Sequence, residues 1–445
     1  MQKKSLVVGV VSVLALAAIA CTGAVSTLAV APASTADSPP SRSVSTPSAS
    51  TGASAPAPAT ATPGSVANGA IEPEPTVAAK ARSEVILLDP DARPSPAIQR
   101  GWSTDFSRHT VDYSEFLAGG PSRDGIPPID NPEFTSVAQP PEYMNAAEPV
   151  IALEINGDAR AYPLAVLIWH EIVNDEVGGV PVSITYCPLC NTAITFDRRV
   201  GDRVLDFGTS GLIRRSDLVM WDHQTESWWQ QITGEAIVGE LVGTKLTFIP
   251  APLVSWSEFT EAYPGGQVLT RNTGFGRNYN AAPYSGYDNL GSQPFLFRGA
   301  IDSALPAMER VIGLEVGQTQ VAYPFGSFSD MPVVHDTVGG QDIVIFFAGG
   351  TLSAFDSGGP EGRRAVGSTG VFSPSLDGED LTFVVKDDVI VDTQTGSEWN
   401  IFGQAVAGEL DGRSLTPVVH ANHFWFAWQA FFPNSEIRTA DNING

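Results

Sequence analysis

The sequence predicts an α+β fold that is mainly β, in which two tandem copies of one subdomain carry one helix each. Three observations support this prediction. The 445 residues include 43 glycines and 34 prolines, which favour many turns and short elements over a helical bundle. Several runs are rich in Val, Ile, Thr and aromatic residues, as strands are. A set of short motifs also occurs twice in the same order.

The repeated motifs define the two copies. Residues 161–163 (Ala-Tyr-Pro) recur at 322–324, and residues 175–179 (Asp-Glu-Val-Gly-Gly) recur as Asp-Thr-Val-Gly-Gly at 336–340. Further along, the pairs are 222–229 with 392–399, 239–241 with 408–410, and Trp256 with Trp425. We therefore place repeat 1, with an N-terminal extension, at residues 101–268 and repeat 2 at residues 311–438.

Strands and one helix are expected within each copy. The clearest strand signals lie at residues 180–186, 193–196 and 342–347. The glycine pairs at 178–179 and 339–340 suit tight turns before a strand. A helix is expected in each copy where aromatic residues recur at helical spacing, and core packing is the main role expected of them. These residues are Trp256, Phe259 and Tyr263 in repeat 1, and Trp425, Trp428 and Phe432 in repeat 2.

The N-terminal part of the chain reads as an export signal and a tether. Lys3 and Lys4 precede an apolar run that reaches Cys21, which follows small or apolar residues as the acylated cysteine of a bacterial lipoprotein does. A membrane-anchoring helix within residues 1–33 is the alternative. Residues 34–81 are mostly Ala, Pro, Ser and Thr and predict a disordered linker. We therefore expect an extracytoplasmic protein held at the membrane.

The charge balance excludes one class of partner. The chain has 25 basic and 49 acidic side chains, so its formal net charge is −24. Such a surface repels the phosphate backbone, and no nucleic-acid partner is expected. The sequence leaves protein and small-molecule partners open.

The chemistry of the chain centres on Cys187-Pro188-Leu189-Cys190, a C-x-x-C turn between two expected strands that occurs only in repeat 1. One interpretation is a structural disulfide between Cys187 and Cys190, as suits an exported protein. A second is metal binding, with thiolates suiting zinc or copper(I). A third is thiol redox exchange, for which a helix after the first cysteine would be the usual setting, whereas residues 192–196 read as strand.

Three histidines could complete a metal site. His170 precedes Cys187 by 17 residues, and His420 and His423 form H-x-x-H before the second aromatic helix. A site across the two copies would use both cysteines with one or more of these histidines. The alternative for each histidine is a structural, hydrogen-bonded role. A separate group of charged residues could line a cleft, but ordinary ion pairs are the role expected of them. These residues are Arg160, Asp197, Arg198, Arg214, Arg215 and Asp217.

The ordered motifs resemble a known family. They include residues 124–132, 159–163, 170–175, 186–190, 216–220 and 424–428. From about residue 101 to the C-terminus the chain resembles the bacterial and archaeal domain-of-unknown-function family 3179. That resemblance implies an exported, often lipid-anchored protein and brings no established activity.

Our functional hypothesis is a tethered extracytoplasmic protein that binds zinc or copper, or acts as a thiol-redox site, through the C-x-x-C turn with His170 close to it. The alternative is a non-catalytic structural or binding protein of the cell envelope, in which a disulfide between the two cysteines staples the turn. An enzyme acting on an envelope substrate is a third option. The sequence carries no common hydrolase or nucleotide-enzyme motif.

Overall fold

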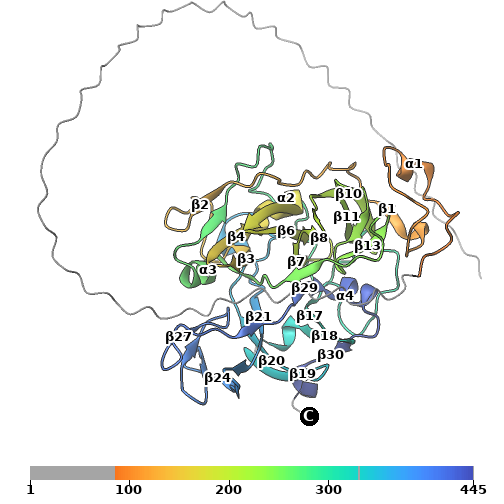
Figure 1. Cartoon of the computed structure of the whole chain (residues 1–445). Helices are drawn as coiled ribbons and strands as arrows, with labels where there is room; N and C mark the ends of the chain where they lie inside the picture. Colours follow the sequence, from red (N-terminus) through yellow and green to blue (C-terminus); the bar gives the residue numbers. More distant parts are fainter. Residues whose placement is uncertain (1–85, 329–330, 444–445) are drawn as a thin grey trace, which may run out of the picture. The chain divides into compact units, whose positions relative to one another are not determined.

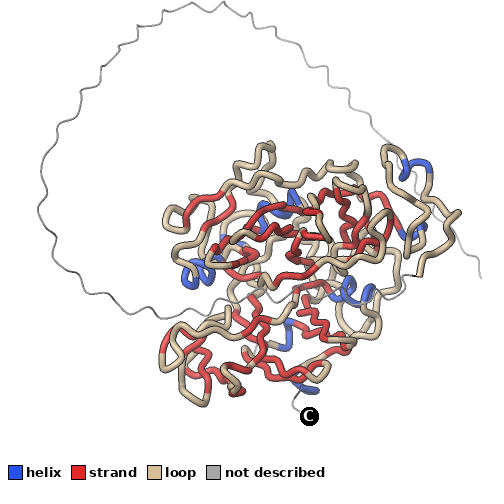
Figure 2. The backbone as a smooth tube through the Cα atoms, in the orientation of Figure 1, coloured by secondary structure: helices blue, strands red, loops and turns tan. Residues whose placement is uncertain are grey.

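The computed structural model describes residues 86–328 and 331–443, and strands dominate this part of the chain (Figures 1 and 2). The prediction of a mainly β fold is confirmed. The expected export signal, Cys21 and the linker lie outside the described residues and stay predictions. No helix within the described ranges is long and apolar enough to cross a membrane.

The first sheet of each copy is built around a β-hairpin. Its strand order is β15-β3-β4-β16-β2 in repeat 1 and β29-β17-β18-β30 in repeat 2. In both copies, the strand before the aromatic helix runs antiparallel to the first hairpin strand, and the strand after that helix runs parallel to the second. The bounds are β2 Phe134–Ser136, β3 Pro149–Ile155, β4 Asp158–Pro163, β15 Leu253–Ser255, β16 Gln267–Leu269, β17 Arg310–Val316, β18 Thr319–Pro324, β29 Ala421–Phe424 and β30 Glu436–Ile437.

The second sheet of each copy contains the predicted strands. Its order is β14-β7-β6-β5 in repeat 1 and β28-β21-β20-β19 in repeat 2. The predicted glycine turn joins β5 to β6, and its residues Gly178 and Gly179 have φ angles of 54° and 81°. The bounds are β5 Ile172–Val177, β6 Val180–Cys187, β7 Thr192–Asp197, β14 Thr247–Ile249, β19 Val333–Val338, β20 Gln341–Ala348, β21 Ser368–Ser373 and β28 Thr416–Pro417.

The third sheet of each copy is an antiparallel meander. The order β10-β11-β12-β13, which β1 extends in repeat 1, corresponds to β24-β25-β26-β27 in repeat 2. A two-stranded hairpin precedes it in each copy. The bounds are β1 Phe116–Ala118, β8 Arg199–Val200, β9 Arg203–Val204, β10 Phe207–Arg214, β11 Asp217–Asp222, β12 Trp228–Gln230, β13 Glu235–Val238, β22 Ser375–Leu376, β23 Glu379–Asp380, β24 Phe383–Lys386, β25 Val389–Asp392, β26 Glu398–Trp399 and β27 Ala405–Ala407.

The helices are short. The predicted aromatic helices are α3, Trp256–Ala262, and α4, Trp425–Phe431. Repeat 1 also contains α2, Leu164–His170, which the sequence analysis did not predict because this apolar run shows no polar face. Its counterpart in repeat 2 is the single turn η2, Phe325–Ser327. The remaining helical turns are α1 Pro96–Gln99, η1 Tyr113–Glu115, η3 Pro360–Gly362 and α5 Ala440–Ile443.

One buried turn occurs in both copies with the same hydrogen bonds. In repeat 1, the Asp222 carboxylate accepts from the Thr225 backbone N–H (2.7 Å) and from Trp229 Nε1 (2.8 Å). In repeat 2, Asp392 accepts from Thr395 (2.6 Å) and from Trp399 Nε1 (3.0 Å). The repetition therefore extends to individual buried contacts. The described residues of both copies fall within one compact unit, so the boundary between the copies stays a prediction.

Replacing Asp392 by alanine is expected to lower the free energy of unfolding by at least about 2 kcal/mol, because the buried Trp399 indole N–H would lose its acceptor. Urea unfolding measures this change. Glu379→Ala, an exposed carboxylate of the same copy, is the control and should have little effect. Equal effects of the two substitutions would contradict the role given to the Asp392 turn.

The two copies differ at the tip of the second sheet. In repeat 1, residues 188–191 join β6 to β7 and carry the second cysteine. In repeat 2, residues 349–367 join β20 to β21. The hairpin tip that carries the cysteines is thus a feature of repeat 1 alone.

Candidate thiol site

The two cysteines lie at the tip of the β6–β7 hairpin. Cys187 is the last residue of β6 and pairs with Thr192, the first residue of β7. Asn191 closes the turn with φ 53°, a left-handed conformation that asparagine tolerates well. The turn therefore has the form that the sequence indicated.

The cysteine sulfurs are close together and buried. The Cys187 and Cys190 Sγ atoms are 2.9 Å apart, and the two side chains are free thiols with 2% and 0% exposure. The Ser216 carbonyl oxygen lies 3.2 Å from Cys190 Sγ and 3.7 Å from Cys187 Sγ. A carbonyl accepts hydrogen bonds, so this contact suits protonated thiols. Burial raises the pKa of both thiols, and that of Cys190 the more strongly.

Asp217, the first residue of β11, is the third member of the site. Its Oδ1 accepts a hydrogen bond from Cys190 Sγ (3.2 Å). Its Oδ2 accepts from Gln230 Nε2 (2.6 Å) and from the Ile232 backbone N–H (2.9 Å). Burial raises the pKa of Asp217 to about 6, although the hydrogen bonds from Ile232 and Gln230 oppose the shift. The expectation that Asp217 forms an ordinary ion pair is wrong, because its described partners are a thiol, an amide and a backbone N–H.

Glu171 is a second buried carboxyl group of the site. It ends α2 with φ 60°, and its backbone oxygen accepts from the Tyr186 N–H (2.8 Å). Burial, and then the nearby charge of Asp217, raise the pKa of Glu171 to about 8. The Glu171 side chain is thus mainly a neutral acid at pH 7, and when it ionises at higher pH its charge raises the pKa of Cys187.

A segment without strands or helices, residues 270–309, covers the cysteine turn; we call it the cover. Tyr287 Oη in the cover donates to the Leu189 carbonyl between the cysteines (3.2 Å). Ser216 Oγ donates to the Phe295 carbonyl (3.1 Å). Burial, followed by the cysteine charges, raises the pKa of Tyr287. The cover therefore limits access to the two thiols.

His170 does not join the cysteines. Its Nδ1 donates to the Pro127 carbonyl (2.7 Å), and its Nε2 accepts from Tyr279 Oη in the cover (2.7 Å). Burial lowers the pKa of His170 and favours this neutral form. Both ring nitrogens are thus occupied. The expectation that His170 lies within ligand reach of the thiols is wrong, and its position indicates that it anchors the cover.

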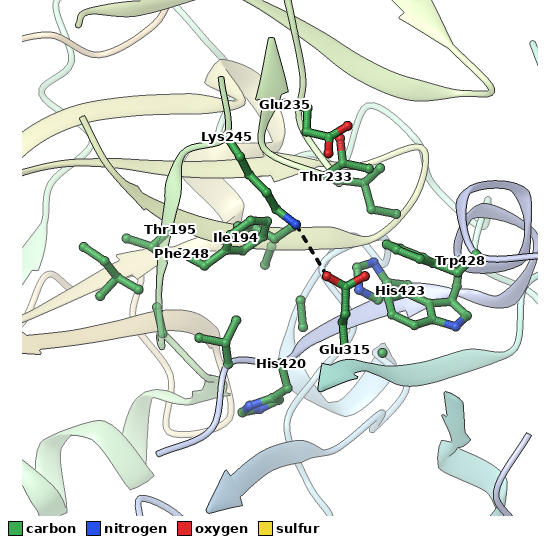
Figure 3. Close-up of a pocket in the computed structure, with 18 residues that line it drawn as sticks. Ile194, Thr195, Thr233, Glu235, Lys245, Phe248, Glu315, His420, His423 and Trp428 are labelled. Atoms are coloured by element: carbon green, nitrogen blue, oxygen red, sulfur yellow. Dashed lines mark hydrogen bonds and ion pairs between the residues drawn. The ribbon is translucent and has the colours of Figure 1, made fainter. Parts of the chain in front are cut away.

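His420 and His423 do not belong to the cysteine turn. They line a pocket of about 400 Å³ between strands of the two copies (Figure 3). His423 Nδ1 contacts Thr192 Oγ1 (2.8 Å), and burial, then His420, lower the pKa of His423 to about 3. His420 Nδ1 donates to the Val418 carbonyl (2.9 Å). In Figure 3, His423 lies beside Trp428, whereas Lys245 points towards Glu315. The expected composite site of cysteines and these histidines does not form.

The residues that could hold a metal are therefore fewer than the sequence suggested. Within the described ranges, the ligand atoms of Cys187, Cys190 and Asp217 lie within 4.8 Å of one another, and no histidine belongs to this group. A structural zinc site normally has four ligands, mostly cysteine and histidine. The group thus supplies three of the four expected ligands.

Comparison with known proteins places the chain in a family. A family model described as "Protein of unknown function (DUF3179)" matches residues 123–435. The chain belongs to the DUF3179 family. The resemblance seen in the sequence motifs is thereby confirmed, and the DUF3179 match includes both cysteines, Asp217, Glu171 and the cover. No curated protein and no solved structure matches the chain.

The sequence analysis missed two members of the site. Glu171 and Asp217 each stand directly before an apolar run in the sequence, Ile-Val after Glu171 and Leu-Val-Met-Trp after Asp217. An acidic residue inside a buried strand or beside an apolar helix must be neutralised or hydrogen-bonded, and this signal could have identified both. The contact of Asp217 with Cys190 and the influence of Glu171 on Cys187 depend on how β11 and α2 pack near the hairpin, which the sequence does not contain.

Proposed function

We propose that Cys187 and Cys190 form a reversible dithiol–disulfide centre, and that this DUF3179 protein transfers two electrons to or from a thiol or disulfide partner outside the cytoplasm. The observation that carries the proposal is the 2.9 Å separation of two free thiols, one of which donates to a carboxylate at 3.2 Å. A disulfide requires the sulfurs to approach to roughly 2.05 Å, a small movement at a hairpin tip. The dithiol and the disulfide are both uncharged, so burial penalises neither state.

The proposed oxidation follows from the two thiol environments. Cys187 is the more exposed of the two and its pKa is raised less, so its thiolate attacks a partner disulfide and releases one partner thiol. Cys190 then transfers its proton to Asp217 and attacks the Cys187 sulfur of the mixed disulfide, displacing the second partner sulfur as a thiolate, which takes that proton back from Asp217. The first partner sulfur takes up the proton that Cys187 released to solvent. One dithiol and one partner disulfide thus give one protein disulfide and two partner thiols.

Metal binding by Cys187, Cys190 and Asp217 is the second candidate, supported by the 4.8 Å grouping of their ligand atoms. The sulfurs of a tetrahedral zinc site stand about 3.8 Å apart, given metal–sulfur bonds of about 2.3 Å. Zinc or copper would require the sulfurs to separate and both thiols to ionise, and zinc would also need a fourth ligand. The redox proposal requires none of these changes.

Mass spectrometry of the folded protein separates these proposals. We expect oxidised glutathione to remove two hydrogens from the native protein, dithiothreitol to restore them, and both cysteines to change together. Cys187→Ser should abolish the reversible change, and metal analysis of the reduced wild type should give less than one equivalent. Stoichiometric zinc or copper that is lost in Cys187→Ser would contradict the redox proposal, and so would a native dithiol that resists oxidation.

A further inference from the structure

A second pocket, of about 380 Å³, lies against the outer side of α2 and the start of the cover. Its walls come from distant segments of the chain, among them residues 142–148, 279–282 and 354–363. Pockets of this size commonly hold small molecules. The charges within the pocket indicate which kind of molecule fits.

Two of the acidic side chains of this pocket are neutralised by arginines. Arg363 Nη1 lies 2.7 Å from Glu148, which also accepts from Asn145 Nδ2 (2.7 Å). Arg364 Nη2 lies 2.7 Å from Asp356. The third acid, Glu142, is exposed at the rim. Glu148 and Asp356 therefore have their own cations.

Arg271 is the exception, because it makes no ion pair with a described residue. Its Nη1 donates to Asn280 Oδ1 (2.7 Å) and its Nη2 donates to the Tyr279 carbonyl (3.1 Å), so both acceptors are uncharged. The guanidinium stacks on Tyr143, with Cζ 3.7 Å from the ring centroid. Its Nε has no hydrogen-bond partner and is buried. A guanidinium has five N–H donors, so one N–H on each terminal nitrogen stays available.

We propose that this pocket binds a small monocarboxylate through Arg271. The Glu148 carboxylate acts on Arg271 without forming an ion pair with it, and Glu148 is already paired with Arg363. A carboxylate ligand matches the planar fork of Arg271 with two parallel hydrogen bonds. Of the three acids, only Glu142 forms no ion pair with a described residue, and its charge would repel a phosphate dianion more strongly than a ligand with a single negative charge. Stacking on Tyr143 and the hydrogen bonds to Asn280 and to the Tyr279 carbonyl hold Arg271 in place before the ligand arrives.

Thermal unfolding of the full chain with added sodium acetate or sodium benzoate tests the site, with sodium chloride at equal ionic strength as the reference. A ligand that binds only the folded protein raises the unfolding temperature. We expect both carboxylates to raise it, and benzamide, the uncharged analogue of benzoate, to have no comparable effect. In Arg271→Met, the concentration of carboxylate needed for the same shift should rise roughly tenfold or more.

Two further variants make the result decisive. Arg271→Lys keeps the positive charge but lacks the planar fork, so it should weaken the stabilisation by carboxylates. Because it keeps the charge, it provides a folded variant for the test if Arg271→Met does not fold. Arg203→Met removes an exposed arginine that pairs with Glu240 and should respond as the wild type does. The proposal is overturned if neither carboxylate exceeds chloride, if both Arg271 variants respond as the wild type does, or if inorganic phosphate stabilises the protein and the carboxylates do not.

Discussion

Replacing Asp217 by asparagine is expected to slow the closing of the disulfide by about a hundredfold, the usual contribution of a positioned general base. Asparagine keeps the shape and can still accept from Gln230 and Ile232, but it cannot take the proton of Cys190. The mixed disulfide between Cys187 and glutathione should therefore accumulate after reduced protein is mixed with oxidised glutathione. Acid quenching followed by mass spectrometry measures this species.

Glu171→Gln is the matched control for this experiment. The pKa of Glu171 is about 8, so its side chain is mostly protonated at pH 7 and glutamine resembles that form. We expect a closing rate close to that of the wild type at pH 7. Above pH 8 the wild-type side chain ionises and the variant does not, so the two rates should separate. Equal rates for Asp217→Asn and the wild type would remove Asp217 from the proposed mechanism.

The second large effect is expected at the anchor of the cover. Tyr279→Phe removes the hydroxyl that donates to His170 Nε2 at 2.7 Å and leaves this buried nitrogen without its partner. Such a loss costs about 1–3 kcal/mol, so opening of the cover should become roughly 5- to 150-fold more frequent. The alkylation rate of Cys187 and Cys190 in the reduced native protein should rise by the same factor.

Tyr113→Phe tests whether that increase is specific to the cover. Tyr113 is also buried, and its Oη donates to the Phe106 carbonyl at 2.8 Å, but it packs in a different part of the core. Its loss should leave the alkylation rate close to that of the wild type. A similar rate for both variants would show that the cover does not control access to the thiols.

Much of the fold could be predicted because it depends on local patterns. The strands around residues 180–196 follow from β-branched and aromatic runs, and α3 and α4 follow from aromatic residues at helical spacing. The repetition of Asp-x-x-Thr in the third sheet reflects one buried turn used twice. The helix α2 was missed because its apolar residues have no polar face to reveal a period.

Of the site, only the closeness of the two cysteines could be predicted from the sequence. The two cysteines are neighbours along the chain, so their proximity follows from a four-residue turn. Asp217 and Tyr287 reach that turn through sheet packing and through the path of the cover, which are long-range consequences of the fold. The prediction that His170 lies beside the cysteines was wrong for a related reason, because long-range packing decides which groups a buried imidazole hydrogen-bonds. For His170 these partners are Pro127 and Tyr279.

An equilibrium redox titration measures whether Cys187 and Cys190 form a reversible disulfide in the native protein. The native protein is equilibrated in thiol–disulfide buffers of graded potential, and its free cysteines are alkylated and counted by mass spectrometry. The account predicts one reversible two-electron transition in which Cys187 and Cys190 change together. Because burial keeps both thiols protonated, the midpoint should fall by about 59 mV per pH unit near neutral pH, two protons at about 29.6 mV each. The redox proposal would be contradicted if the cysteines stayed in one oxidation state at every potential, or if they could be alkylated only after a bound metal had been removed.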